Sequence, residues 1–131
     1  MKKELMENSY PCHVPDRLLN DQLLTFDLPE IIKKIKNEEA WKKGDRNAIT
    51  LLKSPCMRIV LVALHEMAEI DFHQSGNLIS VQLLEGYLNF QMDNQSILLR
   101  TGGLLTLHEP VKHTLIAMNA SVFLLTIIIC P

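Results

Sequence analysis

The sequence is poor in cysteine, in aromatic residues and in long apolar runs, and each shortage excludes a class of protein. The three cysteines, Cys12, Cys56 and Cys130, stand far apart without a C-x-x-C spacing. This pattern predicts reduced thiols rather than a disulfide framework or a zinc site. Aromatic residues make up only 5% of the chain, too few to predict a surface that stacks nucleic-acid bases.

Basic residues are not in excess, which argues against nucleic acid as a partner. Thirteen Lys and Arg residues oppose fifteen Asp and Glu residues, leaving a formal net charge of -2. The longest nearly apolar run, residues 122–130, falls far short of the roughly 20 residues that a membrane-spanning helix needs. The basic start at Lys2 and Lys3 has no apolar stretch behind it, so we expect no secretory signal and a cytoplasmic protein.

Hydrophobic residues nevertheless make up 47% of the 131 residues, enough for one domain with a sizeable core. Residues 1–27 carry no regular pattern and are interpreted as an N-terminal lead-in. Residues 28–43 have apolar side chains at helical spacing, with Asp27 as the N-cap and Gly44 as the stop. We therefore predict a helix within residues 28–44 that packs on the remaining domain, residues 45–131.

From residue 45 onward the apolar pattern changes to a period of two, interrupted by turn residues every eight to twelve positions. This pattern is typical of an all-β barrel or sandwich. The predicted strands are residues 48–53, 57–64, 69–74, 78–84, 87–92, 96–99, 104–107, 111–118 and 121–129. The clearest hairpin turn is at Asp93 and Asn94.

Two of the five histidines, His73 and His113, stand at strand ends that a barrel could bring together. If His73 faces the interior, Asp71 and Ser75 share its face, because strand side chains repeat every second residue. Glu109, in the loop before His113, is a further candidate.

The spacing of these residues resembles the cupin family. Its first motif runs Gly, five residues, His-x-His, three or four residues, Glu, six residues, Gly. Met67 takes the place of the first Gly, and His73, Ser75, Ile79 and Gly86 fall without a gap on the two His, the Glu and the final Gly. Gly86 and His73 match the family residues; the other three do not.

The second cupin motif runs Gly, five residues, Pro-x-Gly, two residues, His, three residues, Asn. Gly102 and His113 match it, whereas His108, Pro110 and Ala117 replace the Pro, Gly and Asn. The resemblance covers about residues 41–129 and implies an all-β cupin (double-stranded β-helix, jelly-roll) barrel with one N-terminal helix, of the small bacterial single-domain kind.

In metal-binding cupins the ion is held by both His and the Glu of the first motif and by the His of the second. Only His73 and His113 remain of these four ligands, and an Ile in place of the Glu cannot ligate. We therefore expect no tightly held metal or other cofactor. If Asp71 or Glu109 supplied a third ligand, a divalent Fe, Mn, Zn or Ni ion could bind.

The sequence thus predicts a barrel that binds a small molecule in a pocket containing His73, Ser75, His113, Asp71 and Ile79. Two enzymatic alternatives stay open. One is a metal-dependent dioxygenase or isomerase that uses His73 and His113 with a non-standard third ligand, and the other is a metal-free isomerase or epimerase with an Asp71–His73 dyad. Because residues 122–130 are apolar on both faces of a strand, the outer face must be covered by the predicted helix 28–43, by the N-terminal segment or by a second subunit, and we expect a homodimer.

Overall fold

The computed structural model describes residues 23–72, 78–108 and 112–129, and within them two short helices precede nine strands. The helices are α3 (Leu28–Lys36) and α4 (Glu39–Lys43). The strands are β1 (Arg46–Lys53), β2 (Met57–Leu64), β3 (Glu69–Phe72), β4 (Leu78–Glu85), β5 (Tyr87–Met92), β6 (Gln95–Arg100), β7 (Leu104–Leu107), β8 (His113–Ala117) and β9 (Ser121–Ile128).

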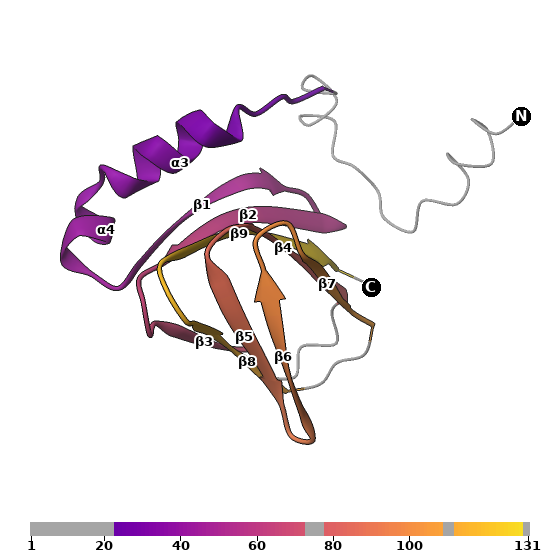
Figure 1. Ribbon diagram of the computed structural model, residues 1–131. Coiled ribbons are helices and arrows are strands. Elements are labelled where there is room, and N and C mark those ends of the chain that lie inside the picture. Colours follow the sequence, from indigo (N-terminus) through magenta and orange to yellow (C-terminus); the bar gives the residue numbers. More distant parts are fainter. Residues whose placement is uncertain (1–22, 73–77, 109–111, 130–131) are drawn as a thin grey trace, which may run out of the picture.

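The strands form two antiparallel sheets that face each other as a barrel (Figure 1). One sheet has the order β1-β2-β9-β4-β7 and the other the order β3-β8-β5-β6. All nine predicted strands are present, and the hairpin at Asp93 and Asn94 joins β5 to β6 with Met92 opposite Gln95. The all-β prediction is confirmed, although the predicted strands 69–74 and 111–118 extend into residues outside the described part.

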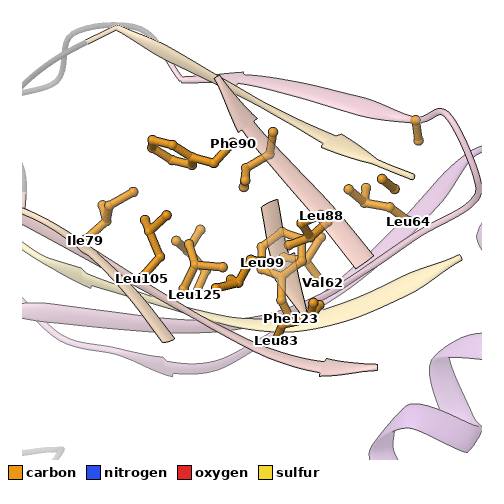
Figure 2. Close-up of a cluster of buried hydrophobic side chains, with 14 residues drawn as sticks. Val62, Leu64, Ile79, Leu83, Leu88, Phe90, Leu99, Leu105, Phe123 and Leu125 are labelled. Atoms are coloured by element: carbon orange, nitrogen blue, oxygen red, sulfur yellow. The ribbon is translucent and has the colours of Figure 1, made fainter. Parts of the chain in front are cut away.

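The barrel interior is filled by apolar side chains from both sheets (Figure 2). Every second residue of a strand points inward, so an alternating pattern places one apolar set in the core. The largest fully buried side chains include Phe90 and Phe123, one from each sheet. The whole buried cluster consists of Val62, Leu64, Ala68, Ile79, Val81, Leu83, Leu88, Phe90, Leu99, Leu105, Leu115, Ala117, Phe123 and Leu125.

Helix α3 covers the outer face of the five-stranded sheet (Figure 1). Asp27 caps its first turn by accepting a hydrogen bond from the Glu30 N–H at 3.4 Å, as the sequence predicted. Ile32 and Ile35 are buried against Leu61, Ala63 and Val122, which lie on the outer faces of β2 and β9. Within the described ranges, neither helix has the length and apolar character that crossing a membrane requires.

The predicted helix 28–43 is in fact two helices, because the chain turns at Asn37 and Glu38. The cause lies in β1, where the Asn47 amide donates hydrogen bonds to the Ile35 carbonyl at 2.8 Å and to Glu38 Oε1 at 2.9 Å. Because the Ile35 carbonyl oxygen accepts a hydrogen bond from Asn47, it does not require an N–H group from a further turn of helix. Gly44 ends the second helix as predicted.

Cys56, which stands directly before β2, is disulfide-bonded, so the prediction of three reduced thiols is wrong. The other two cysteines, Cys12 and Cys130, lie outside the described residues. The lack of a C-x-x-C spacing therefore did not exclude a disulfide at Cys56. The cytoplasmic location stays a prediction that has lost the support of reduced thiols.

Two glycines with positive φ make the turns at Gly86 (φ +99°) and Gly102 (φ +88°), a backbone region that disfavours other residues. They differ in their surroundings. A Cβ atom at Gly86 would collide with the Ser121 side chain and the Ala120 carbonyl oxygen, whereas one at Gly102 would meet nothing within 4 Å.

This difference gives a matched pair of variants. We expect Gly102→Ala to lower the free energy of unfolding by about 1 kcal/mol through backbone strain alone. Gly86→Ala should lower it by about 3 kcal/mol, since strain and a backbone collision add. Urea unfolding measures both values, and equal losses would contradict the described turn at Gly86.

Candidate functional site

The candidate site lies at one end of the barrel, called here the site end, where β3 and β7 finish and β4 and β8 begin. Phe72 at the end of β3 pairs with His113 at the start of β8, and Ile79 near the start of β4 pairs with Leu107 at the end of β7. His73, Ser75 and Glu109 lie outside the described residues. The structure therefore describes three of the predicted site residues, His113, Ile79 and Asp71.

His113 is buried in the barrel interior with 6% of its surface exposed. Its imidazole ring lies between the rings of Phe72 and Phe90, at centroid distances of 4.7 and 4.6 Å and interplanar angles of 17° and 26°. Among the described residues, it is the only buried side chain that can ionise. This position gives the apolar site end one group that can donate and accept hydrogen bonds.

Ile79, which falls on the position of the cupin metal-binding Glu, is 8% exposed and belongs to the apolar core (Figure 2). Its hydrocarbon side chain has no atom that can ligate a metal ion. Within the described residues, no three His, Cys, Asp or Glu side chains are grouped so that they could hold a metal. The donor set described at this end therefore does not fit the metal that the cupin family implies.

Asp71 lies on the outer face of its sheet, which corrects its placement in the pocket. Its Oδ1 accepts a hydrogen bond from Thr114 Oγ1 at 2.8 Å, and Asp71 is exposed. Its neighbours Ile70 and Phe72 pack against the core instead. Because alternate strand residues take opposite faces, the apolar pair at 70 and 72 directs Asp71 outward. Asp71 is thus unavailable as a third ligand beside His113.

Phe72 and Phe90 are site residues that the motif spacing does not predict. Phe90 pairs with Leu115, and both lie on the inner face with His113. A signal for Phe90 was present, because Leu88, Phe90 and Met92 alternate with polar residues and the chain contains only four Phe. The stacking itself could not be predicted, since it depends on the register between β8 and its two neighbouring strands.

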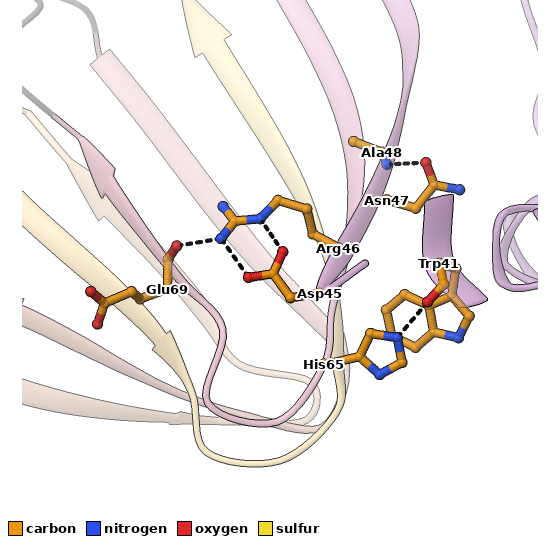
Figure 3. Close-up of polar contacts among 7 residues, drawn as sticks. All are labelled: Trp41, Asp45, Arg46, Asn47, Ala48, His65 and Glu69. Atoms are coloured by element: carbon orange, nitrogen blue, oxygen red, sulfur yellow. Dashed lines mark hydrogen bonds and ion pairs between the residues drawn. The ribbon is translucent and has the colours of Figure 1, made fainter. Parts of the chain in front are cut away.

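Two polar clusters outside the barrel hold elements together rather than forming a site (Figure 3). Arg46 pairs with Asp45 at 2.9 and 3.1 Å and donates to the Glu69 carbonyl at 2.8 Å, which joins β1 to β3. His65 Nε2 donates to the Trp41 carbonyl at 2.8 Å, and the two rings stack at 3.5 Å, which joins α4 to the end of β2.

The Arg46 guanidinium, through its hydrogen bond, holds the pKa of the exposed Asp45 carboxyl below its usual value. A carboxyl whose pKa is lower in the folded state stabilises the protein above the pKa of the unfolded chain. This contribution is lost as the pH falls through the folded-state pKa. The Asp45–Arg46 pair is exposed to solvent, and its expected effect is a small contribution to stability that is lost at acidic pH.

No family model matches the chain, and no relative is found among curated proteins. Solved structures do match. A conserved protein of unknown function from Streptococcus pyogenes is 23% identical, with a TM-score of 0.60 over 66% of this chain and 75% of that one. A cupin superfamily protein from Desulfitobacterium hafniense is 18% identical, with a TM-score of 0.60 over 64% and 77% of the two chains.

A third similar structure is a variant of salicylate 1,2-dioxygenase from Pseudoaminobacter salicylatoxidans. It is 13% identical, with a TM-score of 0.67 over 78% of this chain and 34% of that one. This chain therefore has the cupin fold, and the resemblance in motif spacing is confirmed at that level. The similar structures include an enzyme and a protein of unknown function, and a shared fold does not transfer a specific activity.

The stack around His113 predicts a clear difference between two substitutions. His113→Ala should lower the free energy of unfolding by about 3 kcal/mol, because it leaves a cavity between Phe72 and Phe90. His113→Phe should lower it by less than His113→Ala does, because a ring of similar size keeps the stack. Chemical unfolding checks both, and a large loss in His113→Phe would show that polar contacts, not stacking, hold this ring.

Proposed function

We propose that this protein is a small-molecule-binding cupin that works without a tightly held catalytic metal. The observation that carries the proposal is the position of His113, an ionisable side chain buried in an otherwise apolar wall between two Phe rings. Ligand sites in barrels are mostly apolar with a few polar groups that fix orientation. His113 is the polar group that the described interior supplies.

The surroundings of His113 define the chemical class of the ligand. Six apolar side chains pack half-buried against the same core as Phe90 and Leu115: Val60, Ile70, Phe72, Met92, Leu107 and Ile127. A ligand held there has a flat or apolar body, which stacks on Phe rings, and one carbonyl, hydroxyl or carboxyl group that hydrogen-bonds to imidazole. His73 and Ser75, which follow Phe72 in the sequence, are proposed as further polar contacts.

Metal-free binding is supported by what stands at the ligand positions of the family. Ile79 replaces the carboxylate and is part of the core, and Ser75 replaces an imidazole. Asp71, the substitute carboxylate on β3, points to the outer face. A catalytic metal site normally has three protein ligands, a number that these positions do not reach.

The alternative is a metal-dependent dioxygenase or isomerase in which Glu109 joins His73 and His113. This alternative is supported by the similarity of the fold to that of salicylate 1,2-dioxygenase, which matches with a TM-score of 0.67. The metal-free isomerase alternative is weakened, because its dyad required Asp71 on the inner face beside His73.

One experiment tests metal-free ligand binding and distinguishes it from the metal-dependent enzyme alternative. Protein purified without chelator is analysed for Fe, Mn, Zn and Ni, and its melting temperature is then screened with small aromatic and aliphatic carboxylates, ketones and alcohols. We expect well under one metal equivalent and stabilisation by at least one apolar compound. In His113→Phe, the dissociation constant of that compound should rise about tenfold, the value of one hydrogen bond.

Thr114→Val is the matched control, because Thr114 is the next residue of β8 and faces outward. It should leave the dissociation constant unchanged. Near-stoichiometric metal that disappears in His113→Phe would instead establish the enzyme, and oxygen consumption would be measured next. Failure of every compound to bind, with no metal present, would reject both functions.

The homodimer is proposed separately, from the outer face of the five-stranded sheet. Beyond the part that α3 covers, Leu104 is 63% exposed and Leu78 is 37% exposed on this face. Exposed apolar side chains that share one sheet face are typical of a surface that another subunit covers. We propose that a second copy of the chain packs there.

Light scattering coupled to size exclusion tests the dimer. We expect a mass near twice 15.0 kDa for the unmodified protein and near 15.0 kDa for Leu104→Arg, because a buried, unpaired charge opposes association. Leu98→Arg is the control, since Leu98 is 53% exposed on the outer face of the other sheet. A monomer before any substitution, or equal effects of both variants, rejects this interface.

A further inference from the structure

We propose that Arg58 and Lys53 form an anion-binding rim at the site end of the barrel, and that the ligand is an apolar organic acid whose carboxylate binds this rim. The inference rests on the proposed binding function and names the class of ligand for it. It adds a contact on the five-stranded sheet to His113, which lies on the other sheet.

Arg58 belongs to the interior face of β2. Val60 and Val62 of the same strand both contact the barrel core, and the pairing of β2 with β9 is regular along the whole strand. Because every second residue of a strand takes the same face, Arg58 shares the face of these two valines. Arg58 is nevertheless exposed. An exposed cation therefore stands at the edge of an apolar interior.

Strand pairing connects Arg58 to the candidate site. Arg58 pairs with Ile127 of β9, and Ile127 pairs with Ile79 of β4, so the three residues form one row across the sheet. Ile127 and Ile79 both contact the core, as expected for the interior face. Packed sheets lie about 10 Å apart, so one small molecule can contact His113 on one sheet and extend to Arg58 on the other.

A β-bulge in β1 brings a second cation to the same place. The register between β1 and β2 shifts between Thr50 and Leu52. Lys53 is therefore opposite Arg58, whereas an unbroken register would place it opposite Met57 on the outer face. Residues directly opposite each other on antiparallel strands share a face, so the bulge turns Lys53 to the side of Arg58. Bulges beside functional sites redirect side chains in this way.

The turn between the two cations is held by Ser54. Its Oγ accepts hydrogen bonds from the N–H groups of Cys56 at 3.3 Å and Met57 at 3.0 Å. Its own N–H donates to the Met57 carbonyl at 3.0 Å. These bonds fix the turn that joins β1 to β2, so Lys53 and Arg58 are held opposite each other before any ligand binds.

The two cations repel each other in this arrangement. Like charges directly opposite on neighbouring strands destabilise a sheet. Within the described ranges, no ion pair involves Lys53 or Arg58. A bound anion would offset the repulsion, and a guanidinium group binds a carboxylate through two parallel hydrogen bonds. The rim therefore favours a carboxylate over a neutral group.

The rim and the interior together define an amphipathic ligand. Its apolar body lies among the apolar side chains of the interior, where it can stack on Phe72 or Phe90, and its carboxylate lies at the edge beside Arg58. The acid group stays partly in water there, so binding does not require a fully buried charge. A neutral compound of the same shape keeps the apolar contacts and loses the contact with Arg58.

Calorimetric titration with pairs of probes tests the rim. The probes are phenylacetate, hydrocinnamate and hexanoate, each compared with its neutral amide. We expect the tightest acid to bind at least tenfold more tightly than its amide, because it adds a hydrogen bond between charged groups. Arg58→Gln should abolish this preference and Arg58→Lys should keep part of it. Lys53→Gln should lower it by about threefold, the effect of an exposed charge.

Arg100→Gln is the matched control. Arg100 is an exposed cation that follows the buried Leu99, so it lies on the outer face of the other sheet. This variant should keep the preference for the acid. An equal affinity for acid and amide, or a preference that survives Arg58→Gln, would overturn the rim. If no acid binds while amides, ketones or alcohols do, the rim fails and the proposed binding function stands.

A measurement without ligand tests the repulsion. Arg58→Gln and Lys53→Gln should each raise the melting temperature by about 2 °C, because each removes one of two opposed like charges. Arg100→Gln should not raise it. A lower melting temperature in Arg58→Gln would show that the guanidinium is already paired within the chain, and the rim would then not be a ligand site.

Discussion

Strand β9 is buried on both faces, and the rest of the structure is arranged to meet this constraint. Phe123 and Leu125 point into the barrel core, while Val122 points outward and packs with Ile32 and Ile35 of α3. At about 25 cal/mol per Å² of apolar surface, neither face could be left to water without a large loss of stability. The strand therefore sits between β2 and β4 within the five-stranded sheet, with a second sheet on one side and a helix on the other.

Most of this fold could be predicted because it is encoded locally. The alternating pattern, the turn residues and the Asp27 cap act within a few positions of each other, and the nine strands and the start of α3 are where the sequence placed them. The break in the helix could not be predicted, because it depends on Asn47 reaching back from β1.

Only part of the candidate site could be predicted from the sequence, because the site combines a local motif with contacts between strands. Motif spacing identified His113, whose interior position the structure shows, but it carried no information about Phe72 and Phe90 on neighbouring strands. The prediction that Asp71 faces the interior rests on the assumption that His73 does, because alternate strand residues share a face. Ile70 and Phe72, the apolar neighbours of Asp71, indicate the opposite orientation. Burial of these two large apolar side chains stabilises the fold and therefore directs Asp71 to the outer face.

Ile79 shows why a carboxylate would not fit at this position of the barrel. Its side chain is part of the interior core and pairs with Leu107 and Ile127, both apolar. A carboxylate there would lose packing contacts and would be buried without a hydrogen-bonding partner among these neighbours, which costs several kcal/mol or forces the acid to stay protonated. A protonated acid is a poor metal ligand. The apolar packing of Ile79 and a carboxylate metal ligand are therefore alternatives at this position of the barrel.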